Sequence, residues 1–277
     1  MKTHSRIQIL FTCLLALALR LPASAEWIDG YTNTPMEPDG SNWHVHDPNR
    51  PQPPVVTPGQ QFSQAAQAPS DAEVLFDGTD LSKWETMDLK PAKWRVHDGY
   101  VETQRGGSVR TLGKWADFQL HVEFAEPNPP HGVSQGRGNS GILINNMYEV
   151  QVLDSYQTKT YADGQCAAVY GQMPPLVNAC KPPGEWQTYD IIFESPRWND
   201  KGELIKKAAI TVLHNGVVVQ NHYELVGMTD GINGDVPWKS ASKYGAPHAP
   251  EVFVALQDHN NPVRFRNIWI RTLGKSN

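Results

Sequence analysis

We predict that the chain folds into one large all-β sandwich of two antiparallel sheets, on three observations. From about Glu73 to Leu273, short apolar runs alternate with turn residues at fairly regular spacing, which is the pattern of sandwich strands. The same region shows no long amphipathic helix pattern, no glycine-rich phosphate loop and no dinucleotide fingerprint. Its length, about two hundred residues, fits one large sandwich better than two domains.

The strands are expected where apolar residues alternate with polar ones over short stretches. Between two of these segments, Asn215-Gly216 is a strong signal for a two-residue hairpin turn, because both residues tolerate positive φ. The nine expected strand segments are 94–103, 118–126, 140–145, 148–154, 186–194, 208–214, 217–223, 252–259 and 263–273.

The first 25 residues have the organisation of a secretory signal peptide. Lys2 and Arg6 come first, an apolar run covers residues 7–19, and Ala23-Ser24-Ala25 forms a small-residue cleavage site. The apolar run is too short to cross a bilayer, and no later segment is apolar enough. We therefore expect no membrane span and an exported protein, either periplasmic or secreted.

Residues 26–72 form an N-terminal arm rich in Pro, Gln, Asn and Asp. Such a stretch buries little apolar surface, so we expect it to be extended or polyproline-like, with its aromatic residues available to dock on the domain that follows. His44 and His46 alternate as metal ligands on a strand do. Two histidines are weak evidence for a metal, and surface histidines in an ordered arm are the commoner case.

Charge and cysteine content narrow the partners and the compartment. The formal charge is −5 and no basic block is present, which argues against nucleic acid as a partner. Cleavage of the signal peptide would leave Cys166 and Cys180, and in an oxidising compartment an even pair in one loop region favours a disulfide. Two unpaired structural thiols are the alternative.

One predicted strand places polar side chains opposite a core face. Side chains alternate along a strand, so Val150 and Val152 share one face while Glu149 and Gln151 share the other. If the valines fill the core, Glu149 and Gln151 line a concave outer face.

Asp154 stands out of step with this alternation. Strict alternation would put Leu153 beside the polar pair and Asp154 on the apolar face. A bulge at Leu153-Asp154 would turn Asp154 back toward Glu149, and bulges are frequent next to active sites.

A second strand segment, 252–259, repeats this arrangement. Gln257 and His259 lie opposite the face of Val252 and Val254, so both are expected in the same cleft as Glu149. The alternative is that they are solvated residues on an open sheet face, which alternation alone does not exclude.

The loop 131–141, HGVSQGRGNSG, precedes the Glu149 strand in the sequence and is expected at the edge of the cleft. Arg137 has the donor geometry to hold a carboxylate or a polarised oxygen, with Asn139 beside it. The alternative is an arginine paired with a local acid. Trp186 and Tyr170 are suited to stack on sugar rings, although aromatic residues at strand spacing are more often part of a core.

Four ordered motifs give the chain a resemblance to a known family, from about residue 73 to residue 273. They are LFDGTDLSKWE, GNSGILINNMYEVQVLDSY, PPGEWQTYDIIFE and VALQDHNNPVRFRNIWIRTL. Together they resemble the 3-keto-disaccharide hydrolase family, which belongs with the concanavalin A-like lectins and glucanases. The resemblance implies a jelly-roll sandwich of two antiparallel sheets, one of them concave and sugar-binding.

The resemblance also shows where this chain departs from ordinary glucanases. Their E-x-D-x-x-E strand supplies nucleophile, helper and acid, and the matching positions here are Glu149, Gln151 and Asp154. The middle acid is an amide and the last acid is shorter. Double displacement by a carboxylate pair is therefore not expected.

A ketone at C3 of the sugar, as the family name implies, offers a different route. The ketone acidifies the C2 proton, a base removes it, and the enolate expels the group on C1; water addition then completes a net hydrolysis. Such a route needs a base, an acid and a donor at the enolate oxygen. The expected proton-transfer residues are Glu149, Asp154 and His259. The expected substrate-binding residues are Arg137, Asn139, Gln151, Gln257, Trp186 and Tyr170.

No zinc signature or calcium loop is evident, so no cofactor is expected, although a divalent metal such as calcium in place of Arg137 as electrophile stays open. The expected partner is an oligosaccharide or glycoside substrate. A non-catalytic, lectin-like carbohydrate-binding module is the alternative function, because fold alone does not give function. Convergence of Glu149, Asp154 and His259 in one pocket would favour the enzyme.

Overall fold

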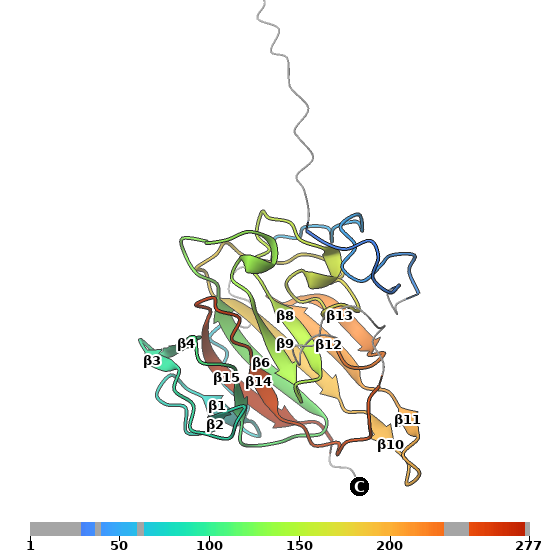
Figure 1. Cartoon of the computed structure of the whole chain (residues 1–277). Helices are drawn as coiled ribbons and strands as arrows, with labels where there is room; N and C mark the ends of the chain where they lie inside the picture. The colour runs from blue at the N-terminus through green and yellow to red at the C-terminus, as the bar shows by residue number, and fades with distance from the viewer. Residues whose placement is uncertain (1–28, 37–39, 60–63, 230–243, 275–277) are drawn as a thin grey trace, which may run out of the picture.

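The computed structural model describes residues 29–36, 40–59, 64–229 and 244–274 (Figure 1). The predicted signal peptide, residues 1–25, lies outside the described residues. No helix among the described residues is long and apolar enough to span a membrane.

Two antiparallel sheets hold most of the strands in the described residues. The larger sheet has the order β13-β12-β9-β6-β15-β4-β3, with β1 also paired to β15, and the smaller has the order β2-β5-β14-β7-β8. Most neighbours are not consecutive in the chain, as in a jelly roll. The predicted fold class, an all-β sandwich of two antiparallel sheets, is confirmed.

The larger sheet contains β1 (Glu73–Phe76), β3 (Arg95–His97), β4 (Tyr100–Glu102), β6 (Phe118–Ala125), β9 (Gln187–Glu194), β12 (Ala209–His214), β13 (Val217–Glu224) and β15 (Arg264–Thr272). The smaller sheet contains β2 (Trp84–Thr86), β5 (Val109–Thr111), β7 (Ser140–Ile144), β8 (Tyr148–Val152) and β14 (Val254–Leu256). A separate hairpin pairs β10 (Arg197–Trp198) with β11 (Leu204–Lys206), and two short 3₁₀ turns cover η1 (Ser134–Gly136) and η2 (Ala162–Gly164).

Each of the nine predicted segments contains a strand. The strands that were not predicted (β1, β2, β5, β10 and β11) have two to four residues, too few for a clear alternation. The hairpin turn is confirmed: His214 pairs with Val217, and Asn215 and Gly216 have φ of 50° and 79°.

The apolar core lies between the two sheets. It joins side chains of β6 and β9, such as Leu120 and Ile191, to side chains of β7, β8 and β14, such as Ile142 and Val254. Full burial of one such side chain typically contributes about 1.5–3 kcal/mol. The core therefore fixes which face of each strand remains for polar groups.

Strand β8 follows the predicted alternation and then leaves it. Val150 and Val152 are buried in the core, as predicted. Leu153 belongs to the same core cluster, so the side chains of two consecutive residues, Val152 and Leu153, lie in the core where the strand ends. The break in alternation occurs where the sequence predicts one, and Asp154 is thereby kept off the apolar face.

The N-terminal arm packs on the domain at the end where the loops between β8 and β9 gather, as the blue segment in Figure 1 shows. Val55 forms a parallel bridge with Asn178, and the Val56 amide donates to the Asn178 carbonyl at 2.9 Å. His46 is fully buried and its Nδ1 lies 2.8 Å from Asp163 Oδ2. The interpretation of His46 as a surface histidine is wrong, because a partner 117 residues away in the sequence buries it.

We expect Leu153→Ala to lower the free energy of unfolding by about 2–5 kcal/mol, the range for large-to-small changes in a core. Leu112→Ala is the matched control, because the Leu112 side chain is 56% exposed, and its effect should stay within about 0.5 kcal/mol. Urea unfolding measures both. Equal small effects would mean that Leu153 does not pack between the sheets.

Candidate active site

Glu149 lies on the outer face of β8, opposite the core, yet its side chain is only 5% exposed. On the neighbouring strand β7, a Cβ atom at Gly141 would stand 2.6 Å from Glu149 Oε1. Any other residue at position 141 would therefore collide with the carboxyl group. Glycine leaves the space in which this carboxyl group sits.

The buried state of Glu149 follows from pairing on both sides of β8. On one side β8 pairs with β7. On the other side the loop segment 167–170 pairs with it: the Ala167 amide donates to the Gln151 carbonyl at 2.9 Å, and the Tyr170 amide donates to the Glu149 carbonyl at 3.1 Å. The loop thus covers what would be an exposed sheet edge.

Two glutamine side chains contact the Glu149 carboxyl group, and further amides lie next to one of them. The Gln151 amide lies between Glu149 and Gln135: in one orientation its NH₂ donates to Gln135 Oε1 at 3.0 Å, and in the other it donates to Glu149 Oε1 at 3.1 Å. Asn139 Nδ2 donates to the Gln135 carbonyl at 2.7 Å. Gln257, the residue after the end of β14, forms a side-chain hydrogen bond with Glu149. The structure therefore brings four predicted residues together: Glu149, Gln151, Asn139 and Gln257.

Burial raises the pKa of Glu149 from 4.5 to about 8, and the hydrogen bond with Gln257 opposes this shift only in part. A carboxyl group in water is ionised at neutral pH, whereas this one exchanges its proton in the neutral range. Proton-transfer groups work best with a pKa near the working pH. With a pKa of about 8, the Glu149 carboxyl group is suited to transfer protons near neutral pH.

Asp154 has a different partner. Its Oδ2 accepts from Arg137 Nε at 2.6 Å, and its Oδ1 accepts from the Tyr156 amide at 3.1 Å. Burial raises the pKa of Asp154, and Arg137 opposes that shift. The alternative stated for Arg137, an arginine paired with a local acid, is thus what the structure shows. The Arg137–Asp154 pair lies just beyond the end of β8, next to the side-chain amides that accompany Glu149.

Two predicted site residues, His259 and Trp186, form no hydrogen bond or ion pair with Glu149 among the described residues. His259 is exposed, because β14 ends at Leu256 and the alternation that was expected to carry His259 into the cleft stops there. Trp186 packs under the guanidinium of Arg266, at 4.0 Å, on the larger sheet. Its ring serves as a cation–π partner there. Of the predicted aromatic pair, only Tyr170 lies on the loop that covers β8.

A second buried polar group, missed by the sequence analysis, lies next to Tyr170. The ring of His46 is 4.9 Å from that of Tyr170 and 4.0 Å from that of Tyr161, and the two tyrosine hydroxyls are 2.6 Å apart. Asp163 pairs with His46, with its Oδ2 2.8 Å from His46 Nδ1. In the sequence, the alternation of His44 and His46 was the only indication of this group. It did not show that Asp163, Tyr161 and Tyr170 would be the neighbours of His46.

Glu126, at the end of β6, is a further buried acid that the sequence analysis missed. Its two oxygens accept from Gln187 Nε2 at 2.9 and 2.8 Å, and burial raises its pKa well above the usual range. A Cβ atom at Gly138 would stand 3.0 Å from Glu126 and 3.3 Å from Asp154. Position 138 therefore separates the two acids.

A cavity of about 450 Å³ lies between the arm and the loop that follows β8. Gln52 and Val55 of the arm line it, together with Tyr156, Lys159 and Cys180 of the loop. Glu149 is not among its lining residues. The cavity and the Glu149 group are therefore two distinct features of the described residues.

Cys166 and Cys180 are buried and carry free thiols, so the structure does not contain the predicted disulfide. Their sulfur atoms nevertheless lie within 4.8 Å of each other. Oxidation in an exported protein stays a prediction that the position of the two thiols permits.

We expect the stability of the wild-type chain to fall, relative to Glu149→Gln, as pH rises from about 4.5 to about 8. In this range the folded chain keeps the proton on Glu149 and the unfolded chain has lost it. The full difference is on the order of 5 kcal/mol, since each pKa unit corresponds to about 1.4 kcal/mol. Urea unfolding at several pH values measures it, with Glu203→Gln, an exposed acid, as control. Parallel curves for wild type and Glu149→Gln would contradict the buried, protonated carboxyl group.

Residues 71–271 match the family model of the 3-keto-alpha-glucoside-1,2-lyase-like domain. A 3-keto-disaccharide hydrolase of Bacteroides thetaiotaomicron is 27% identical over 256 residues, covering 75% of this chain and 81% of the relative.

Two solved structures from Parabacteroides distasonis, each described as a "putative glycosyl hydrolase", are also similar. The first is 43% identical, with a TM-score of 0.68, and the match covers 85% of this chain and all of the other. The second, 24% identical with a TM-score of 0.52 and covering 73% and 99%, supports the fold alone. Since the family model spans most of the chain, the protein belongs to the 3-keto-alpha-glucoside-1,2-lyase-like domain family.

Proposed function

We propose that this protein is a hydrolase that cleaves the glycosidic bond of 3-keto-disaccharides. Family membership and the relative named 3-keto-disaccharide hydrolase support this substrate class. The similar structure described as a "putative glycosyl hydrolase" supports glycosidic-bond cleavage more broadly. The pattern of residues 1–25 supports export to the periplasm or the exterior as part of the same proposal.

The observation that carries the proposal is one titratable carboxyl group surrounded by amides. Ordinary retaining and inverting glycosidases use two carboxyl groups that face each other across the scissile bond. Among the described residues, the groups around Glu149 are amides such as Gln151 and Gln257, and the nearby Asp154 is paired with Arg137. This arrangement suits a reaction that needs one proton-transfer group more than a reaction that needs a carboxylate pair.

In the proposed reaction, ionised Glu149 removes the C2 proton of the 3-keto sugar. The C2–H electron pair forms the enolate, whose charge rests on the C3 oxygen, and amide NH₂ groups are suited to stabilise that oxygen. The enolate then expels the C1 oxygen of the leaving sugar, and protonated Glu149 returns the proton to it. Addition of water across C1–C2 restores the 3-keto sugar and completes a net hydrolysis.

A carbohydrate-binding module is the second candidate, and one observation favours it. Glu149, Asp154 and His259 do not share partners: Glu149 is among amides, Asp154 is paired with Arg137, and His259 is exposed. A binding module would retain the 3-keto sugar without cleaving it. Product analysis therefore separates the two functions.

We expect the protein to cleave a 3-keto-disaccharide and to leave the unoxidised parent nearly intact, because the parent lacks an acidic C2 proton. Glu149→Gln should lower kcat by roughly 10²–10⁴-fold with little change in substrate affinity. Glu203→Gln is the control. Chromatographic product analysis and calorimetric binding measure both quantities. Rapid cleavage of the parent would favour ordinary glycosidase chemistry, and binding of the 3-keto sugar without cleavage would favour the binding module.

The pH dependence should follow the same group. With Glu149 as base, kcat/KM should rise tenfold per pH unit in the acidic range and level off above about pH 8, because only the ionised form removes the proton. The residual activity of Glu149→Gln should not show this rise with pH. If kcat/KM of the variant rises with pH as in the wild type, another residue is the base.

A further inference from the structure

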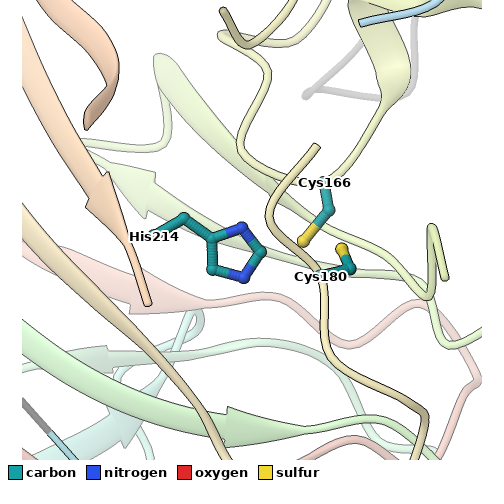
Figure 2. A group of neighbouring side chains, drawn as sticks. All are labelled: Cys166, Cys180 and His214. Carbon is teal, nitrogen blue, oxygen red and sulfur yellow. The ribbon is translucent and has the colours of Figure 1, made fainter. Parts of the chain in front are cut away.

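Three side chains that bind soft metal ions meet in the interior, away from the Glu149 carboxyl group. Cys166, Cys180 and His214 each present a ligand atom, and these atoms lie within 4.8 Å of one another (Figure 2). All three residues are buried. Among the described residues this is the one group of three or more such side chains with this spacing.

The three residues come from two parts of the fold. Cys166 and Cys180 belong to the long connection between β8 and β9, and His214 is the last residue of β12 in the larger sheet. Figure 2 shows the three side chains pointing toward one another from these separate segments. A ligand bound by all three would join the connection to the sheet.

The hydrogen bonds of His214 fix which ring nitrogen is available. His214 Nε2 lies 2.9 Å from Gln187 Oε1. The same oxygen accepts from the Lys181 amide and from Asn215 Nδ2, while Gln187 Nε2 donates to Glu126. Because Gln187 Oε1 is an acceptor in all these contacts, Nε2 of His214 carries the hydrogen and Nδ1 carries the lone pair. Histidines that bind metals are commonly oriented by such a contact to a carbonyl oxygen.

Charge balance suits a divalent ion with two thiolates. Loss of the two thiol protons and gain of one divalent cation leave the net charge of this buried region unchanged, which avoids the cost of burying an uncompensated charge. Zinc–sulfur and zinc–nitrogen distances of about 2.3 and 2.0–2.1 Å place tetrahedral ligands about 3.3–3.8 Å apart. Side-chain movements of about 1 Å would bring the present spacing into that range.

We propose that Cys166, Cys180 and His214 bind one zinc ion, which holds the connection between β8 and β9 against the larger sheet. A water molecule completes the four ligands, as in other zinc sites with three protein ligands. The cavity that Cys180 lines, between the arm and the connection, provides an entry path. The same connection carries the residues that pair with β8, so the ion supports the burial of Glu149.

Zinc and a disulfide exclude each other at this pair, and one experiment separates them. The full chain, without an affinity tag, is purified under reducing conditions, stripped with a chelator, incubated with excess Zn²⁺ and desalted. Elemental analysis should then give about one zinc per chain. Co²⁺ in place of Zn²⁺ should give a thiolate-to-cobalt charge-transfer absorption, and bound zinc should protect both thiols from alkylation.

Variants test whether these three residues are the ligands. Cys180→Ser and His214→Gln should each lower the zinc retained by at least tenfold at limiting Zn²⁺. His222→Gln should keep the full amount, since its side chain is 62% exposed on the neighbouring strand β13. Circular dichroism confirms that each variant is folded.

Three results would overturn the proposal, and the first two need only the wild-type chain. The first is that folded, reduced protein retains no zinc. The second is that, after the reductant is removed in air with excess Zn²⁺ present, a Cys166–Cys180 disulfide forms in preference to zinc binding. The third is equal zinc content in wild type, Cys180→Ser and His214→Gln.

Discussion

The candidate site depends on the pairing of β8 with the loop segment 167–170. Without that pairing, β8 would be the edge of the smaller sheet, and its outer face would be open to water beside it. The backbone bonds from Ala167 and Tyr170 to β8 close this edge and leave Glu149 buried among amides. The raised pKa of Glu149 is a consequence of this burial, so the geometry of a loop sets the chemistry of a strand.

Local sequence patterns predicted the elements well and their long-range partners poorly. Alternation placed Val150 in the core and Glu149 on the opposite face, and Asn215-Gly216 marked a turn, because each depends on neighbours along the chain. The pairing of His46 with Asp163 was not predictable, because 117 residues separate them and neither position has a distinctive local pattern. The surroundings of His259 were not predictable for a related reason: a strand face extends only as far as the strand, and alternation does not reveal that β14 ends at Leu256.

The site also shows how amides change the role of a carboxyl group. A second carboxylate next to Glu149 would raise its pKa further by repulsion and would divide acid and base roles between two residues. With amides as neighbours, burial dominates, and one group is left to exchange a proton in the neutral range. Arg137 pairs with Asp154, the other nearby acid, so the positive charge of the arginine balances the negative charge of that carboxylate.

The proposed mechanism requires Glu149 to remove the C2 proton of a 3-keto sugar before or during bond cleavage. The most direct measurement follows, by NMR, a 3-keto-disaccharide deuterated at C2 in ordinary water. We expect slower cleavage of the deuterated sugar or, where proton removal is reversible, loss of deuterium from unreacted substrate; both effects should require Glu149. Cleavage at an unchanged rate, with the deuterium retained in the product, would contradict this mechanism.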